Sequence, residues 1–140
     1  MILISHRGNL NGPDPKNENS VKYIEKAINE GFEVEIDVYF SNGSFYLGHD
    51  YGKEEVKLEW FYKKPLWCHA KNYDAFKNLL TNNLHCFWHD QDKFTLTSKG
   101  FIWAYPGIQG NHKTIAVKPE NYKLKLNDFC GICSDWITSY

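Results

Sequence analysis

Arginine is almost absent from this sequence of 140 residues: 16 residues are lysine or arginine, and Arg7 is the only arginine. A guanidinium presents a planar fork of donors that binds phosphate or carboxylate oxygens two at a time, which the ammonium of lysine cannot do. Arg7 lies between His6 and Gly8, directly after the apolar run MILIS. This position favours an anion-binding role for Arg7 over that of a solvated surface charge.

An excess of charge of one sign is also absent. The formal net charge is -1, and the chain contains no block of basic residues. Binding to a nucleic-acid backbone needs many cationic contacts, so the composition gives little support for a nucleic-acid partner and fits a nuclease poorly. We expect a small-molecule partner instead.

Long hydrophobic runs are missing as well. No segment approaches the roughly 20 apolar residues of a membrane span. Met1 leads into ILIS without the basic region and the apolar stretch of a signal peptide. We therefore expect a cytoplasmic protein with no membrane span.

Cysteine is scarce, with 4 residues. Cys130 and Cys133 form a C-x-x-C pair, which suits structural zinc or a redox pair. Cys68 and Cys86, however, lie singly in apolar runs, whereas zinc sites normally show two paired spacings. Reduced and mostly buried thiols are the expectation, with zinc or redox chemistry as the alternatives.

The residues that are abundant can build one hydrophobic core, because 42% of the chain is hydrophobic and 16% is aromatic. The length is usual for a single domain, and we predict one domain over residues 1–140. Apolar spacing and end signals predict amphipathic helices over 19–31 and 73–83. The segment 32–40 alternates strictly and predicts a strand, and SNGS after it predicts a hairpin.

Further short apolar runs alternate with these elements. They are MILIS, PLWCHAKN, LHCFWHD, GFIWAYPG, TIAVKPE and GICSDWI. Such alternation is typical of a mostly parallel sheet in an α/β protein. A closed (β/α) barrel of the TIM type fits the series, although typical examples take roughly 250 residues. We predict a small, helix-poor barrel of this type, with a β-hairpin after the second strand.

Polar residues follow the predicted strands at the ends where a parallel barrel places its chemistry. They are His6 and Arg7, Glu35 and Asp37, His49 and Asp50, and His69 and Lys71. Glu35 and Asp37 are two residues apart, so both side chains point to the same side of their strand. Neighbouring carboxylates repel each other unless a cation lies between them. This spacing therefore predicts a divalent metal site.

The order of these motifs resembles a known family. HRG, NENS, GFEVEIDV and NGSFYLGHD are similar to the HRG, PENT, G-x-x-x-E-x-D and HD pattern of the glycerophosphodiester phosphodiesterase superfamily, of the PI-PLC-like phosphodiesterases. The resemblance is strong over the first half of the chain. The tail GICSDWITSY resembles the last barrel strand of that family more weakly. The chain resembles a compact, shortened branch of the superfamily.

The resemblance implies a role for each matching residue. His6 and His49 correspond to the general acid and base, and Glu35 and Asp37 to metal ligands. Arg7 corresponds to a phosphate contact. The metal is a divalent ion, and its identity among Mg, Ca, Mn and Zn is left open.

The third strand departs from the family pattern of E-x-K. HAK places His69 where the family has a ligand carboxylate, whereas Lys71 keeps the phosphate contact. Imidazole can ligate a divalent ion, and the site would then favour Mn or Zn over Mg or Ca. The alternative is that the metal site is impaired.

Other histidines and aromatic residues have weaker assignments. His89, Trp103 and Tyr105 lie at strand ends, where they are candidates for the wall of a substrate pocket. His85 lies in an apolar run and is expected to be structural, and His112 is expected to be a solvated loop residue.

These observations favour a metal-dependent phosphodiester hydrolase that acts on a small glycerophosphodiester-like substrate by histidine acid/base catalysis. The attacking group is either water or a neighbouring substrate hydroxyl, and in the second case the first product is a cyclic phosphate. The alternative is a catalytically inactive remnant of the same fold that binds a phosphate or metabolite. The missing third carboxylate and the short connections favour this alternative.

Overall fold

The computed structural model describes residues 1–140. Its strands are β1 (Ile2–His6), β2 (Glu33–Ser41), β3 (Ser44–Leu47), β4 (Glu54–Val56), β5 (Leu66–Ala70), β6 (Cys86–Phe87), β7 (Phe94–Leu96), β8 (Ile102–Ala104), β9 (Thr114–Val117) and β10 (Gly131–Ser134). The helices are α1 (Val21–Asn29), α2 (Leu58–Phe61) and α3 (Tyr73–Thr81), with 3-10 helices η1 (Pro119–Asn121), η2 (Leu126–Asp128) and η3 (Ile137–Ser139).

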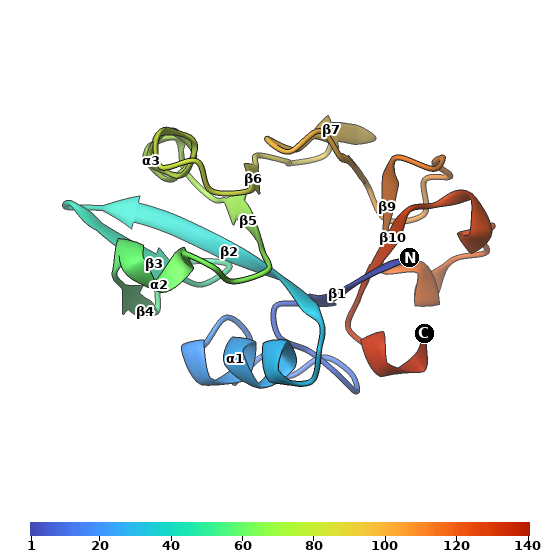
Figure 1. Ribbon diagram of the computed structural model, residues 1–140, viewed down its shortest axis with the longest axis horizontal. Coiled ribbons are helices and arrows are strands. Elements are labelled where there is room, and N and C mark those ends of the chain that lie inside the picture. The colour runs from blue at the N-terminus through green and yellow to red at the C-terminus, as the bar shows by residue number, and fades with distance from the viewer.

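All ten strands belong to one curled, mixed sheet. Parallel pairing gives the order β6-β5-β2-β1-β10-β9-β8, with β1 between β2 and β10. The strands curve around the middle of the molecule, with α1 beside β2 and α3 beside β2 and β5 (Figure 1). The predicted α/β class and the mostly parallel, helix-poor sheet are confirmed.

The hairpin after the second strand is also confirmed. Asn42 and Gly43 have φ values of 50° and 80°, and positive φ at both central positions is what a tight two-residue hairpin turn requires. β2 and β3 pair antiparallel on either side of this turn, and β4 adds to β3. The hairpin extends beyond the parallel part of the sheet and returns the chain to the level of Asp37, whose carbonyl oxygen accepts a hydrogen bond from the Gly48 amide.

Both predicted helices form, and α1 is two residues shorter at each end than the predicted range 19–31. The Ser20 side chain donates to the Asn17 carbonyl and does not cap the helix. A Glu54 carboxylate oxygen accepts from the Val21 amide instead, at 2.9 Å. At α3 the Asn72 side chain accepts from the Ala75 amide, as expected of an N-cap.

The helices are short, and α1 and α3 have 9 residues each. None of the helices has the length and the apolar content that crossing a lipid bilayer requires.

The prediction of a closed barrel is wrong. No strand pairing joins β6 to β8, so the sheet remains an open half-barrel. Residues 88–101 fold back as β7, which pairs antiparallel with β8, because this connection is close to the minimum of about a dozen residues that a parallel crossover needs. Across the gap the Ser98 amide donates to the Cys86 carbonyl at 2.8 Å. The rings of Phe87 and Trp103 stack there with centroids 4.6 Å apart.

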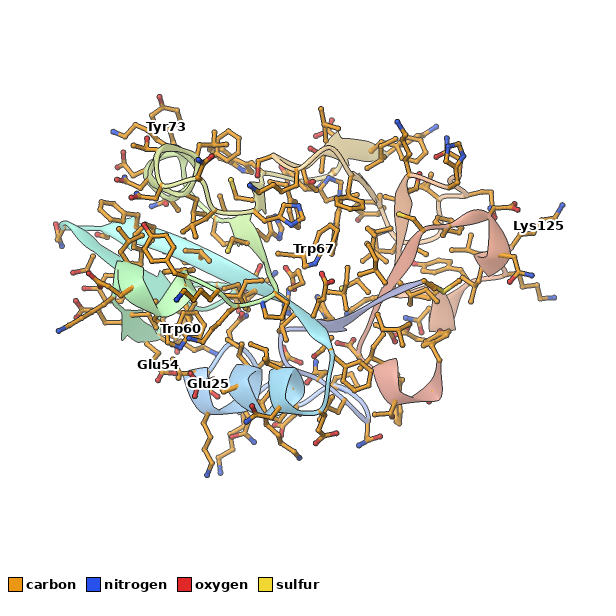
Figure 2. All side chains as sticks on the ribbon, viewed as in Figure 1. Glu25, Glu54, Trp60, Trp67, Tyr73 and Lys125 are labelled. Carbon is orange, nitrogen blue, oxygen red and sulfur yellow. The ribbon has the colours of Figure 1, made fainter.

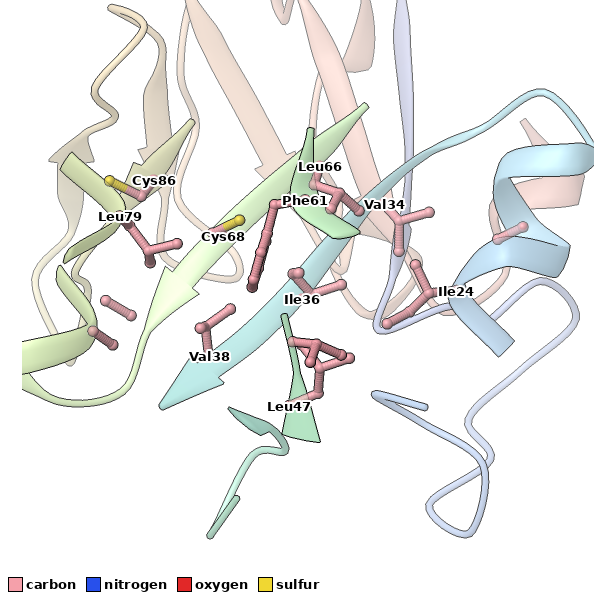
Figure 3. Close-up of a cluster of buried hydrophobic side chains, with 14 of the residues drawn as sticks. Ile24, Val34, Ile36, Val38, Leu47, Phe61, Leu66, Cys68, Leu79 and Cys86 are labelled. Carbon is pink, nitrogen blue, oxygen red and sulfur yellow. The ribbon is translucent and has the colours of Figure 1, made fainter. Parts of the chain in front are cut away.

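Two apolar clusters lie on opposite sides of the curled sheet. The inner cluster consists of Ile4, Trp67, Phe87, Trp103, Ile115, Val117 and Cys133. Trp67 points into the middle of the molecule, whereas Tyr73 and Lys125 lie at its periphery (Figure 2). The larger outer cluster includes Ile24 of α1 and Leu79 of α3, packed against the outward side chains of β2 and β5 (Figure 3). The helices therefore cover the outside, and aromatic side chains fill the inside.

We predict that the Phe87 ring is a main support of the open side of the sheet. Phe87 is fully buried, and truncation of a buried phenylalanine typically costs about 3–5 kcal/mol. Phe87→Ala should lower the free energy of unfolding by that amount in urea denaturation. Phe94→Ala is the matched control, because Phe94 is 46% exposed on the terminal strand and such changes usually stay within about 0.5 kcal/mol. Equal losses in the two variants would contradict the assignment.

Candidate active site

The parallel strands place a layer of polar side chains directly above the inner apolar cluster. Along several strands, an inward apolar residue is followed two positions later by a polar residue on the same side. The pairs are Ile4 and His6, Trp67 and His69, Phe87 and His89, Trp103 and Tyr105, and Cys133 and Asp135. Because side chains alternate along a strand, these polar side chains lie together at the carboxyl ends of the strands, as predicted.

A pocket of about 310 Å³ opens at this layer. It is lined by His6, Arg7, Glu35, His49, His69, His89, Trp103, Tyr105, Pro106, Val117 and Lys118. Most of the residues singled out in the sequence are therefore together in one pocket. Asp37 and Lys71 do not line it, and the Asp37 side chain is fully buried beside it.

Glu35 and Asp37 are buried carboxylates that lie next to each other on β2. Asp37 is held by Asn19, whose side-chain amide donates to Oδ2 and whose amide oxygen accepts from the Asp37 backbone, both at 2.9 Å. Glu35 Oε2 and Asp37 Oδ1 have no hydrogen-bond partner. An unpartnered buried carboxylate oxygen is costly, so Glu35 Oε2 calls for a ligand, whereas Asp37 Oδ1 has the ring of His69 3.3 Å away.

Two cations lie against Asp37. Arg7 Nε is 2.9 Å from Oδ2, and Lys71 Nζ is 3.8 Å from Oδ1. Burial alone would raise the pKa of Asp37, but His69, Arg7 and Lys71 together hold it below its usual range. Asp37 is therefore ionised. Arg7 Nη1 also approaches Glu18, at 3.4 Å, so part of the guanidinium is already engaged by carboxylates.

His69 faces both carboxylates through one ring nitrogen. Its Nε2 is 2.8 Å from the His89 carbonyl oxygen and therefore donates to it. Its Nδ1 lies 3.3 Å from Asp37 Oδ1 and 3.7 Å from Glu35 Oε1. Burial alone would lower the pKa of His69, but the two carboxylates raise it to about 9. In the neutral ring, the lone pair of Nδ1 is the one directed at the carboxylates.

These three side chains fit a divalent metal ion. One ligand atom from each of Glu35, Asp37 and His69 can be chosen so that all lie within 4.8 Å of one another. Two of the carboxylate oxygens lack partners, and the His69 Nε2–H bond to a backbone carbonyl is the outer contact that metal-binding histidines usually make. The mixed oxygen and nitrogen set suits Mn or Zn better than Ca.

His6 forms a pair with Asp135. His6 Nδ1 is 2.6 Å from Asp135 Oδ1, and because a carboxylate only accepts, Nδ1 bears the proton. The other ring nitrogen, Nε2, lies 3.8 Å from Glu35 Oε2 and has no hydrogen bond. Asn9 donates to the same Asp135 oxygen at 2.7 Å. His6 is therefore oriented with a free basic nitrogen, as a general acid or base requires.

His49, in the loop after β3, also has an aspartate beside its Nδ1, but this aspartate is its exposed neighbour Asp50. Its Nδ1 lies 2.6 Å from Asp50 Oδ1, so Nε2 is again the free nitrogen. The side chain is 42% exposed. The Tyr39 hydroxyl donates to the His49 carbonyl at 3.0 Å and ties this loop to β2.

The other aromatic residues and histidines singled out in the sequence lie either at the wall of the pocket or in the core. Trp103 is buried and stacks on Phe87, so only Tyr105, at 40% exposure, is an open aromatic wall. Both ring nitrogens of His89 are buried without a partner. His85 lies outside the pocket against Trp67, and burial lowers its pKa to about 4.

Sequence reasoning missed Asp135 and Lys118. Asp135 could have been found, because it follows Cys133 by two residues along the last strand and so extends the inward series. Lys118 had no such signal, because it lies one residue after the inward Val117. Its ammonium is nevertheless 3.0 Å from Asp135 Oδ2.

Comparison of the chain with protein-family models, with curated protein sequences and with solved structures found no match.

We predict that Glu35→Gln weakens binding of Mn²⁺ by at least about 10-fold, a loss that even outer partners of metal ligands typically produce. Isothermal titration calorimetry measures this directly. Glu33→Gln is the matched control from the same strand, because the Glu33 carboxylate accepts from the Trp67 indole and takes no part in the cluster. Equal affinities in the two variants would show that Glu35 is not a ligand.

We also predict that His69→Glu changes the order of metal preference. A third carboxylate makes the site harder and more negative, which favours Mg or Ca relative to Mn or Zn. Titration of each metal into the wild type and the variant measures the order. His112→Glu, in an exposed loop, controls for the added charge. An unchanged order would exclude His69 from the coordination sphere.

Proposed function

We propose that the protein is a metal-dependent phosphodiesterase that hydrolyses a small glycerophosphodiester-like substrate. The proposal combines the resemblance of the HRG, E-x-D and HD motifs with the geometry of the pocket. One observation supports it above the others: His6 and His49, each with Nδ1 2.6 Å from an aspartate oxygen, line the same pocket as Glu35, one of whose oxygens has no hydrogen-bond partner.

Each residue has a chemical task in this proposal. One histidine, His6 or His49, takes the proton from the attacking hydroxyl as the new phosphorus–oxygen bond forms. The other histidine protonates the leaving alkoxide as its bond to phosphorus breaks. Two such groups in one pocket, one for the attacking group and one for the leaving group, are what an in-line displacement needs. Water as the nucleophile gives a phosphomonoester, and a substrate hydroxyl gives a cyclic phosphate.

The negative charge that builds on the non-bridging oxygens needs preorganised cations. Arg7 lines the pocket and offers the guanidinium donors that Asp37 and Glu18 leave free. Lys71 acts through Asp37, which it contacts. A divalent ion held by Glu35, Asp37 and His69 would supply further stabilisation of this charge as a Lewis acid.

A panel assay tests the proposed function. Purified protein is incubated with glycerophosphodiesters that differ in head group, each with Mg, Ca, Mn, Co or Zn, and the released alcohol is measured. Turnover that depends on the metal supports the proposal. Absence of turnover in every combination contradicts it. If inorganic phosphate still binds in that case, the chain is better described as a phosphate-binding protein.

We predict that His49→Ala lowers kcat by about 100-fold or more, the usual contribution of a general acid or base. His49 is partly exposed, so its removal leaves the core intact. His6→Ala should show a similar loss, with circular dichroism to confirm that it folds. His112→Ala is the matched control, because that side chain is exposed and lies outside the pocket. A variant of either pocket histidine that keeps more than about a tenth of wild-type kcat would remove that residue from the mechanism.

A further inference from the structure

Lys118 reaches the pocket by a departure from regular strand geometry. The inward side chains of β9 are Ile115 and Val117, which belong to the inner cluster, whereas Ala116 belongs to the outer one. Continued alternation would turn residue 118 outward. Instead Lys118 lines the pocket. Its backbone has φ 48° and ψ 49°, in the left-handed region.

This backbone conformation is unfavourable for lysine. Six residues other than glycine have positive φ, and three of them are asparagines, which tolerate it because their short side chains bond locally. Lysine has no such compensation. Residue 118 also precedes Pro119, and a residue before proline ordinarily takes extended backbone. Strain of this kind persists where the surroundings require it, and it is concentrated at functional sites.

The strained backbone brings a cation to Asp135. Lys118 Nζ lies 3.0 Å from Asp135 Oδ2, whereas Oδ1 accepts from His6 and Asn9. Glu120, two residues further on, accepts from the Asp135 amide at 3.3 Å. One short segment therefore holds both the side chain and the backbone of Asp135. The Asp135 side chain is only 5% exposed, so little water is available to replace the ammonium.

We infer that Lys118 is a positioning residue, which fixes Asp135 so that His6 keeps its proton on Nδ1 and its free Nε2 toward the pocket. Removal of the ammonium leaves a buried carboxylate oxygen without a partner. Asp135 then relieves that cost by turning, and its bond to His6 loosens. The consequence for turnover rests on the function proposed above, but the consequence for His6 does not.

Lys118→Gly is the main variant, because glycine accepts the left-handed backbone without strain and lacks only the side chain. Lys118→Arg retains a cation. Lys123→Gly, at an exposed position outside the pocket, is the matched control. Thermal unfolding of all three shows whether they fold.

The first measurement is the tautomer of His6, from two-bond ¹H–¹⁵N spectra of the histidine rings without metal or substrate. His6→Ala assigns the signals. In the wild type, Lys118→Arg and Lys123→Gly, His6 should be protonated on Nδ1. In Lys118→Gly, a mixture of tautomers or loss of the Nδ1-protonated form is expected. An unchanged His6 tautomer in a folded Lys118→Gly protein overturns the inference, whether or not the protein is an enzyme.

The second measurement is turnover on the best substrate of the panel. Lys118→Gly should lower kcat by about 10-fold or more, as loss of outer positioning contacts typically does, with little change in KM, and Lys118→Arg should restore most of it. A rise in KM at unchanged kcat would instead make Lys118 a substrate contact and would contradict the positioning role. If the wild type shows no turnover, the proposed function fails and the tautomer measurement alone decides the role of Lys118.

Discussion

Two carboxylates buried side by side on one strand are the constraint on which this site depends. Glu35 and Asp37 point inward from β2, and both are almost completely buried. Ionised groups in such surroundings need opposite charges or donors close by. Arg7, Lys71, His69 and Asn19 meet that need at Asp37 from three different parts of the chain. The carboxylates thus organise the polar layer, and the oxygens they leave without partners define where a metal ion fits.

Two cations of the site come from positions that the alternation of side chains along a strand would turn outward, away from the pocket. Arg7 follows the inward His6, and Lys118 follows the inward Val117, so regular strands would turn both cations outward. Both residues adopt positive φ, at 58° and 48°, and both line the pocket. Each then approaches a buried aspartate. The same local departure from strand geometry therefore occurs twice, each time at a residue that pairs with a buried aspartate.

Local patterns in the sequence predict most of the elements and the cluster on β2 and β5, because alternation and the Asn42–Gly43 turn are properties of short segments. Glu35, Asp37 and His69 meet because the neighbouring parallel strands β2 and β5 place residues at the same height of the sheet side by side. Asp37 pairs in register with His69. Closure of the barrel is not a local property. It depends on the path of residues 88–101, and the Lys118 contact depends on a backbone angle that no pattern signals.

Inside the half-barrel, successive inward positions of the same strands form two layers, an apolar lower one and a polar upper one. Trp67 and Phe87 pack in the lower layer, whereas His69 and His89, two residues later, belong to the upper one. The layers touch where the His69 ring stacks on Phe87, with centroids 4.9 Å apart, so a substitution of His69 also reaches the lower packing. The scaffold is therefore most open to evolutionary change at upper-layer positions such as Tyr105, whose ring contact is with His89 of the same layer, because an exchange there alters the pocket without disturbing the stacked core.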